Sequence, residues 1–121
     1  MKKLTTFKPE FIEKRWGGEL WIANDSCHDY CGKILYIKKG KSTSMHFHEK
    51  KHETFYVLEG TLEVKFIDTE TGEEETVRAT HGESMKMPTV TPHKLSAPID
   101  DVKLIESSTY HMDSDSYRVY L

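Results

Sequence analysis

The chain has 121 residues with a formal net charge of −3, a size that suits one folded domain. A negative net charge gives no basic field for nucleic acid or for an anionic membrane, so we expect neither as a partner. No apolar run approaches the roughly 20 residues of a membrane span, and no apolar core follows residues 1–3, so we expect a cytoplasmic protein without a signal peptide.

Residues 1–30 are expected to form an N-terminal arm and a first strand. Residues 8–16, KPEFIEKRW, are the one segment whose pattern allows a helix, and Pro9 suits its first turn. Trp16 and Trp21 give the arm a large apolar content, as is common in protein interfaces. We expect this arm to pack across a second copy and form a homodimer. The alternative is that both rings cover the chain's own interior.

Cys27 and Cys31 come next along the chain and are too few for a disulfide framework. With His28 they would supply part of a zinc site, but no second cysteine pair completes it. We expect ordinary reduced thiols.

Short runs rich in β-branched and aromatic residues then alternate with turn signals, mostly within residues 31–110. In chain order the runs are residues 19–24, 33–40, 53–60, 61–68, 75–80, 83–88, 93–98 and 102–108. Glu59-Gly60 predicts a tight hairpin and Thr71-Gly72 a longer one. This pattern predicts an all-β fold, a single antiparallel sandwich or barrel of about nine to eleven strands, with residues 111–121 as a tail.

The stretch SMHFHEKKHETF, residues 44–55, is crowded with ionisable groups. His46 and His48 are two positions apart, so on a strand both point to the same face, and Glu53 opens the next strand. His93 begins a late strand that could add a third imidazole. Such nitrogen and oxygen donors suit one divalent ion of zinc, manganese, iron, cobalt or nickel. These four ligands would leave a position open for substrate.

The same residues carry a resemblance to a known family. Gly40, five residues, His46, one residue, His48, four residues, Glu53, six residues and Gly60 resemble the first cupin motif at every defined position. A pattern with this many fixed positions has a small risk of arising by chance. The resemblance implies a small β-barrel of jelly-roll type with a metal inside its mouth.

A second motif of the same family follows downstream. Gly82, five residues, Pro88 and then His93 resemble it, but Val90 stands where the motif usually has glycine and Ala97 where it usually has asparagine. Neither position is a ligand, so the expected metal set is unchanged. The turn before His93 is expected to differ in shape.

A narrower resemblance covers most of residues 1–121, which we expect to form a single cupin domain. Residues 13–22 and 32–60 are similar to the cupin domain of type II mannose-6-phosphate isomerases, and the tail is similar to that group's acidic tail through Asp113, Asp115 and Arg118. This resemblance implies a small carbohydrate ligand: a sugar, a sugar phosphate or a nucleotide sugar. It does not establish the reaction, because cupins keep one barrel for unrelated chemistries.

Three functions remain open from the sequence. In the first, the metal polarises a sugar oxygen and a base moves a proton, as in an isomerase or epimerase. Glu53 could act as ligand or base, and His52 and Lys86 are further catalytic candidates, although His52 points away from Glu53 if the strand has begun. The second is a non-catalytic carbohydrate-binding cupin, and the third an iron-dependent dioxygenase.

Overall fold

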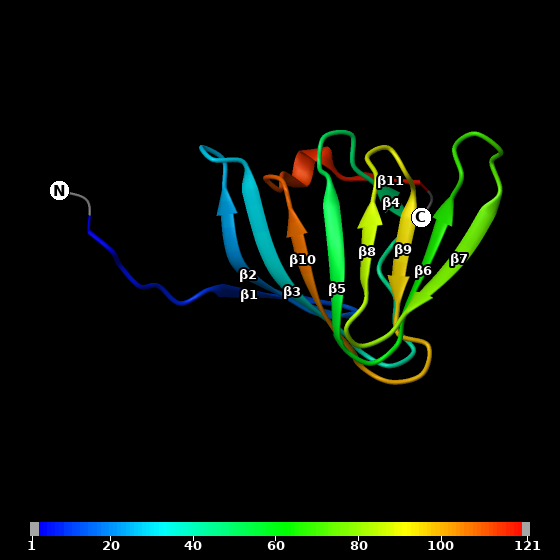
Figure 1. The fold of residues 1–121 in the computed structure, drawn as a ribbon, viewed down its shortest axis with the longest axis horizontal. Helices are drawn as coiled ribbons and strands as arrows, with labels where there is room; N and C mark the ends of the chain where they lie inside the picture. Colours follow the sequence, from blue (N-terminus) through cyan, green and yellow to red (C-terminus); the bar gives the residue numbers. More distant parts are fainter. Residues whose placement is uncertain (1–2, 120–121) are drawn as a thin grey trace.

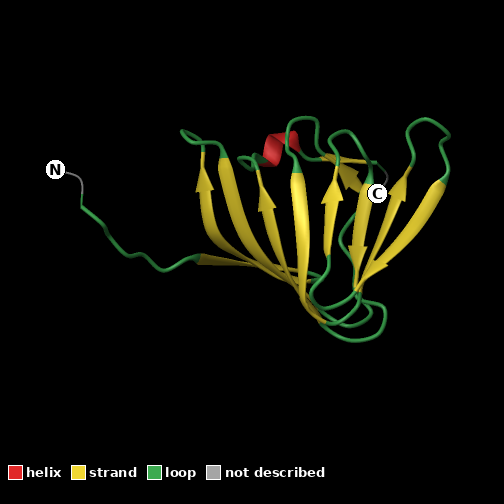
Figure 2. Cartoon of the chain, viewed as in Figure 1, coloured by secondary structure: helices red, strands yellow, loops and turns green. Residues whose placement is uncertain are grey.

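The computed structural model describes residues 3–119, and the fold is all-β (Figures 1 and 2). The expected arm and tail also include residues 1–2 and 120–121, which lie outside the described residues. The strands are β1 (Glu10–Lys14), β2 (Gly17–Asp25), β3 (Tyr30–Ile37), β4 (His46–Phe47), β5 (Glu53–Glu59), β6 (Leu62–Ile67), β7 (Glu74–Ala79), β8 (Ser84–Met87), β9 (His93–Ser96), β10 (Val102–Ser108) and β11 (Tyr117–Arg118), with a 3₁₀ turn, η1, at Asp113–Asp115. None of the helical turns in the described part is long and apolar enough to span a membrane.

The strands form two antiparallel sheets that face each other. One sheet has six strands in the order β1-β2-β3-β10-β5-β8, and the other has five in the order β11-β4-β9-β6-β7. Neighbours such as β3 and β10 are far apart in the sequence, as in a jelly roll, and the first described residues extend away from the body (Figure 1). The all-β, jelly-roll prediction is confirmed.

Alternation of buried and exposed residues explains why these segments pair as strands. In β3 the side chains of Cys31, Lys33, Leu35 and Ile37 are buried, and those between them are less buried. Period-two burial of this kind places one face of each strand on the interior. The apolar core is formed by Leu35, Ile37, Phe55, Val57, Leu62, Val64, Ala79, Met87, Leu95, Ala97, Val102 and Leu104.

Residues 8–16, whose pattern allowed a helix, form no helix. Glu10–Lys14 is strand β1, which pairs antiparallel with β2, with Phe11 opposite Leu20. The pattern failed because hydrogen bonding to the open edge of a sheet outweighs a weak local helix preference.

One predicted hairpin is confirmed and the other is wrong. The turn at Thr71-Gly72 joins β6 to β7, which pair with each other. The turn at Glu59-Gly60 instead leads from β5 in one sheet to β6 in the other. Gly60 has a φ of +83°, and a β-carbon there would collide with the carbonyl oxygen of Asp101. Its glycine therefore marks a tight crossing between sheets.

The two tryptophans lie against the chain's own interior, as the alternative held. Trp16 packs against the apolar core. The indole of Trp21 donates a hydrogen bond of 2.9 Å to Glu19 and meets the ring of His111 edge-on, with centroids 5.3 Å apart. A homodimer stays a prediction.

Candidate metal centre

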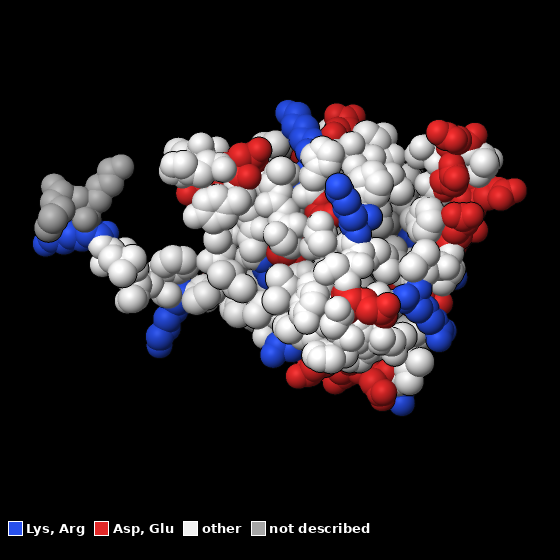
Figure 3. All heavy atoms as spheres, in the orientation of Figure 1, with Lys and Arg blue, Asp and Glu red and all other residues white. Residues whose placement is uncertain are grey.

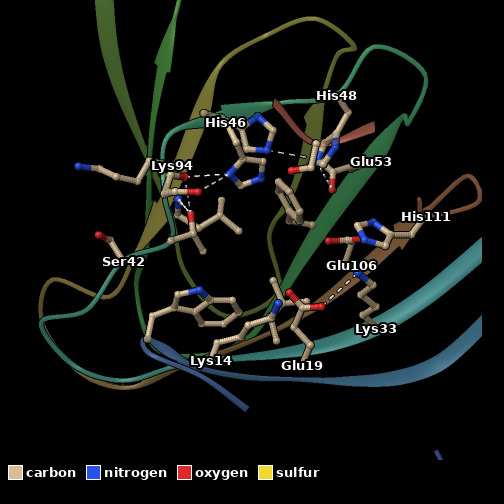
Figure 4. Close-up of a pocket in the computed structure, with 18 of the residues that line it drawn as sticks. Lys14, Glu19, Lys33, Ser42, His46, His48, Glu53, Lys94, Glu106 and His111 are labelled. Atoms are coloured by element: carbon tan, nitrogen blue, oxygen red, sulfur yellow. Dashed lines mark hydrogen bonds and ion pairs between the residues drawn. The ribbon is translucent and has the colours of Figure 1, made fainter. Parts of the chain in front are cut away.

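The histidines of both motifs meet inside the molecule. Figure 4 shows His46 and His48 of the first motif beside Glu53. His46 of β4 lies directly opposite His93 of β9, and His48 follows β4 by one residue. One ring nitrogen from each of these three residues lies within 4.8 Å of the other two. Two strands far apart in the sequence therefore bring three imidazoles together.

Each of these imidazoles is oriented by a backbone carbonyl. The Nδ1 atoms of His46, His93 and His48 lie 2.8, 2.8 and 3.0 Å from the carbonyl oxygens of Ser44, Thr91 and Asp115. A carbonyl can only accept, so Nδ1 carries the proton and Nε2 keeps its lone pair. This arrangement leaves three Nε2 atoms as donors to a metal, and it is the usual way of fixing a metal-binding histidine.

Glu53 begins β5 and lies beside the imidazoles. Its Oε2 is 3.3 Å from Nε2 of His93, and its Oε1 is 3.8 Å from Nε2 of His48 and 3.1 Å from Nζ of Lys51. The residue is buried, and Oε2 has no hydrogen-bond partner among the described residues. A buried, unpartnered carboxylate oxygen is costly unless another group satisfies it. A cation among the histidines would do so.

The donor set fits a divalent metal. Two atoms bonded to one ion at about 2.1 Å can be at most about 4.2 Å apart, and the three histidine nitrogens lie within 4.8 Å of one another. A small side-chain adjustment would therefore bring them into bonding range. Imidazole nitrogens with a carboxylate oxygen suit several first-row divalent ions and do not select one of them.

Burial and neighbouring charges keep these groups in the forms that bind metals. Burial, together with the nearby His93, lowers the pKa of His46 to about 4, and burial also lowers the pKa of His48. Burial alone would raise the pKa of Glu53, but its contacts with His93 and Lys51 lower it below the ordinary range. The neutral imidazoles of His46 and His48 and the ionised carboxylate of Glu53 can bind a cation without first losing protons.

The histidines form part of the wall of a cavity of about 620 Å³. Its charged lining residues are Lys14, Arg15, Lys33, Lys51, Lys94, Arg118, Glu19, Glu53, Glu106 and Asp113. Lys51 is buried and lies 3.1 Å from Glu106 and 2.9 Å from Nδ1 of His111, and Lys33 is buried 3.1 Å from Glu19. The cavity therefore combines a candidate metal centre with a wall of buried, paired charges.

Sequence reasoning missed Glu106 and Lys33 as cavity residues and gave Lys51 only as a lysine that could reach the rim. Glu106 lies two positions beyond Leu104 on β10, and Lys33 lies two positions before Leu35 on β3. Each is a charged residue on the inward face of an otherwise apolar strand, and that signal was present in the sequence. Lys51 lies in the turn before β5, where the period of two gives no direction.

Two of the predicted catalytic residues do not reach the cavity. His52 is exposed and is not among the lining residues. Lys86 pairs with Thr54 across β5 and β8, so it shares the outer face with Thr54, opposite the inward-facing Glu53. The alternation of strand faces separates both residues from the histidines.

The turn before His93 keeps the conformation that glycine favours, contrary to expectation. Val90 has a φ of +56°, and its N–H donates a hydrogen bond of 2.7 Å to the carbonyl of His48. A β-branched residue rarely adopts this region of φ. The turn thus links the two motifs, and its backbone is strained at Val90.

Solved structures similar to this chain share its fold. CapF from Staphylococcus aureus matches with a TM-score of 0.81 and 17% identity over 96% of this chain and 34% of that chain. Oxalate decarboxylase from Bacillus subtilis matches with a TM-score of 0.80 and 14% identity over 98% and 33%. KdgF from Halomonas sp. matches with a TM-score of 0.69 and 21% identity over 87% and 91%. The chain thus spans about a third of the first two proteins, and identities this low show the fold alone.

A search of curated proteins gives no match to this chain. The family model described as "Cupin domain" matches residues 33–106. That range contains both motifs and the four predicted ligands, His46, His48, Glu53 and His93. The chain belongs to the cupin family.

Proposed function

We propose that this cupin binds one divalent metal ion through His46, His48, His93 and Glu53 and acts on a small carbohydrate as an isomerase or epimerase. The observation that carries the proposal is the geometry of the centre. Three imidazoles, each anchored through Nδ1, and an unpartnered carboxylate oxygen face one another in the wall of a cavity of about 620 Å³. A site of this size has room for a small-molecule substrate.

Residues of the cavity wall would bind the metal and transfer the proton. A bound ion would polarise a carbonyl or hydroxyl oxygen of the sugar. Glu53 offers Oε2 as the fourth ligand, since Lys51 already engages Oε1. Glu106 takes the proton-transfer role in place of His52 and Lys86, because it lines the cavity. Burial and the charge of Glu53 raise the pKa of Glu106, which makes it a stronger proton acceptor than an ordinary carboxylate.

The charges of the cavity favour a substrate with an anionic group. Three of the four acidic lining residues have a lysine partner: Glu19 with Lys33, and Glu53 and Glu106 with Lys51. The fourth, Asp113, lies 2.9 Å from Nε2 of His111. Lys14, Arg15 and Arg118 line the same cavity and form no ion pair within the described residues. Arg118 lies opposite His46 in the β11–β4 register, so both point to the same face. Arginine binds phosphate and carboxylate groups well.

A carbohydrate is the substrate class that this environment and the resemblances support. Charged and hydroxyl-bearing side chains dominate the wall, and the ring of Trp16 adds an apolar surface. CapF, which shares the fold, is described as a capsular polysaccharide assembling protein. A sugar phosphate or nucleotide sugar combines hydroxyl groups with the anionic group that Arg118 would bind.

A screen with metal-loaded protein tests this proposal. Protein purified without chelator is expected to contain about one divalent ion per chain, and His46→Ala is expected to lose it while staying folded. Sugar phosphates and nucleotide sugars are then tested for binding by calorimetry and for isomerisation or epimerisation by NMR. Absence of both binding and turnover in the metal-loaded wild type would reject the proposal.

The same experiment separates the alternative functions. Binding without turnover identifies a non-catalytic carbohydrate-binding cupin. Oxygen uptake by iron-loaded protein, with no isomerisation, identifies a dioxygenase. Glu53→Gln adds a finer distinction, because the amide keeps the size of the side chain and loses its charge. It is expected to weaken metal binding and, if Glu53 itself moves the proton, to retain substrate binding and lose turnover.

We also propose a homodimer, formed through the outer face of the six-stranded sheet. The strand registers place one apolar row across five strands of this face: Phe11, Leu20, Ile34, Ile105 and Tyr56. Most atoms over these strands belong to uncharged residues, whereas acidic side chains gather at the β6–β7 hairpin (Figure 3). An extended apolar face of this kind is typical of an interface. Light scattering at micromolar concentration is expected to give twice the chain mass, and a monomeric mass would reject the dimer.

A further inference from the structure

Asp115 of η1 is buried, and its carboxylate binds the turn between β4 and β5, which connects His48 to Glu53. Its carboxylate accepts hydrogen bonds from the backbone N–H groups of Glu49 at 3.0 Å, Lys50 at 3.2 Å and Lys51 at 3.1 Å. A carboxylate that accepts several backbone N–H groups holds them in a fixed arrangement. Asp115 therefore fixes the path of the chain between His48 and Glu53.

The main chain of the same residue orients a candidate ligand. The carbonyl oxygen of Asp115 accepts the Nδ1–H of His48 at 3.0 Å. For His46 and His93 the corresponding carbonyls come from residues two positions away, Ser44 and Thr91. His48 alone of the three depends on a partner from a distant segment of the chain.

We infer that Asp115 is the positioning residue of the metal centre and that, through it, the C-terminal segment forms part of the centre. This inference rests on the proposed metal site. The backbone carbonyl of Asp115 binds the ring of His48, and its carboxylate binds the turn that follows. Asp115 therefore fixes the position of His48 relative to Glu53. Partners of this kind raise metal affinity by orienting the ligand before the metal binds.

The C-terminal segment has other attachments, so a change at Asp115 should not release it. The side-chain amide of Asn24 exchanges two hydrogen bonds with the backbone of His111, at 2.8 and 3.0 Å. At the other end the N–H of Val119 donates to the carbonyl of Met45 at 3.0 Å. Asp115 can therefore be altered while both ends of the segment stay in place.

The chain offers a matched control at Asp68. Its carboxylate likewise accepts hydrogen bonds from two backbone N–H groups, those of Glu70 at 2.8 Å and Thr71 at 3.3 Å. This turn lies in the β6–β7 hairpin and does not line the cavity of the histidines. Asp68→Asn tests what the loss of a turn-capping carboxylate does without changing the metal centre.

The test is a titration of the metal-free full chain with Co²⁺, followed by visible absorption, for wild type, Asp115→Asn and Asp68→Asn. Asparagine keeps the size of the side chain but presents an amide N–H₂ toward backbone donors. We expect Asp115→Asn to bind Co²⁺ about 10–100-fold more weakly and with an altered absorption spectrum. The backbone carbonyl of Asp115 is unchanged in this variant, so in ¹⁵N NMR of the metal-free protein all three histidines should keep the Nδ1–H tautomer, and the weaker binding is then assigned to the turn between His48 and Glu53. Asp68→Asn is expected to match wild type in affinity and spectrum.

The outcomes separate this inference from the proposed function. If the wild type does not bind Co²⁺, the proposed metal site fails. If the wild type binds it and Asp115→Asn has the same affinity and spectrum, the inference is overturned and the metal site stands. An equal loss of affinity in Asp68→Asn would also overturn it, by showing a general effect of stability. Should Asp115→Asn not fold, the titration is repeated with Asp115→Glu, where affinity equal to wild type would overturn the inference.

Discussion

The interior of this cupin has a polar end and an apolar end, built by the same strands. Along the inward faces the residues change from Lys33 to Leu35 in β3, from Glu53 to Phe55 in β5, from His93 to Leu95 in β9 and from Glu106 to Leu104 in β10. Side chains at both ends are buried: Glu106 is 4% exposed and Leu104 is 0% exposed. On each of these four strands, the polar and the apolar interior residues are therefore only two positions apart.

The two ends differ in what they contribute to stability. Apolar burial stabilises the fold by about 25 cal/mol for each Å² removed from water. Buried charges lose hydration, and ion pairs such as Lys51 with Glu106 offset that loss only in part. An apolar residue at position 106 would stabilise the fold more than a buried charge does, yet Glu106 places a carboxyl group in the cavity wall. The polar end is therefore the part of the interior that stability alone does not explain.

The largest expected effect is a loss of turnover on substitution of Glu106, at the polar end. Glu106→Gln keeps the size of the side chain and removes its ability to carry a proton. With the substrate that the screen identifies, we expect turnover to fall by about 10²–10⁴-fold. Metal affinity should stay close to wild type, because Glu106 is not among the proposed ligands.

The control is Glu63→Gln on β6, where Glu63 pairs with Arg78 and does not line the cavity. Steady-state kinetics of both variants are compared with those of wild type. Equal turnover in Glu106→Gln and wild type would remove Glu106 from the proposed chemistry.

Leu104→Ala tests the apolar end, two residues away on the same strand. Leu104 is fully buried in the core cluster. Removing its side chain should lower the free energy of unfolding by about 2–5 kcal/mol, through lost burial and the cavity left behind. Co²⁺ affinity of the folded variant should stay close to wild type. Denaturant unfolding of the metal-free protein gives the first quantity, and a loss below about 1 kcal/mol would contradict the division of the interior.

Lowering the pH should reduce the free energy of unfolding of the metal-free protein, through the buried histidines of the polar end. Burial lowers the pKa of His46 from 6.5 to about 4, and it likewise lowers the pKa of His111 to about 4. Between pH 6.5 and 4 the unfolded chain binds protons at these rings and the folded chain does not. Stability is therefore present above pH 6.5 and is lost as the pH falls toward 4. From pH 7 to pH 5 we expect His46 alone to account for about 2 kcal/mol.

Urea unfolding at pH 7, 6 and 5 in the presence of chelator measures this loss. In His46→Gln the slope against pH should be smaller, because the glutamine does not titrate. Burial raises the pKa of Glu106, so its titration acts in the opposite sense, and this contribution is common to wild type and His46→Gln. An unchanged slope in His46→Gln would show that His46 is not held neutral by the fold.

Local patterns in the sequence were enough for the fold class and for the grouping of the histidines. The period of two placed His46 and His48 together, and the spacing of the cupin motifs pointed to Glu53 and His93. The structure brings the three histidines together with Glu53 beside them. The pair His46 and His48 follows from spacing within one segment, whereas His93 lies on a strand far along the chain and was grouped with them through the resemblance to the cupin motifs.

The other features depend on pairings that no local pattern contains. Asp115 meets the turn at Lys51 across 64 residues of chain, and β10 carries Glu106 into place between β3 and β5. The Glu59-Gly60 turn was located correctly, but its sequence does not say that the next strand joins the other sheet. Residues 10–14 form a strand only because β2 offers a partner edge. Tertiary pairing, which local propensity cannot supply, decided each case.

Val90→Gly gives the smallest expected effect, and it concerns strain at the polar end. Val90 holds a φ of +56° in the turn that bonds to His48. A left-handed conformation costs a residue with a β-carbon about 1–2 kcal/mol, and glycine avoids this cost but loses about 0.5–1 kcal/mol of chain entropy. Val90 is 49% exposed, so little apolar burial is lost. We expect the free energy of unfolding to rise by about 0.5–1 kcal/mol, with Val90→Ala gaining less because alanine keeps its β-carbon. Destabilisation of Val90→Gly in denaturant unfolding would show that the valine side chain stabilises this turn more than its backbone strain costs.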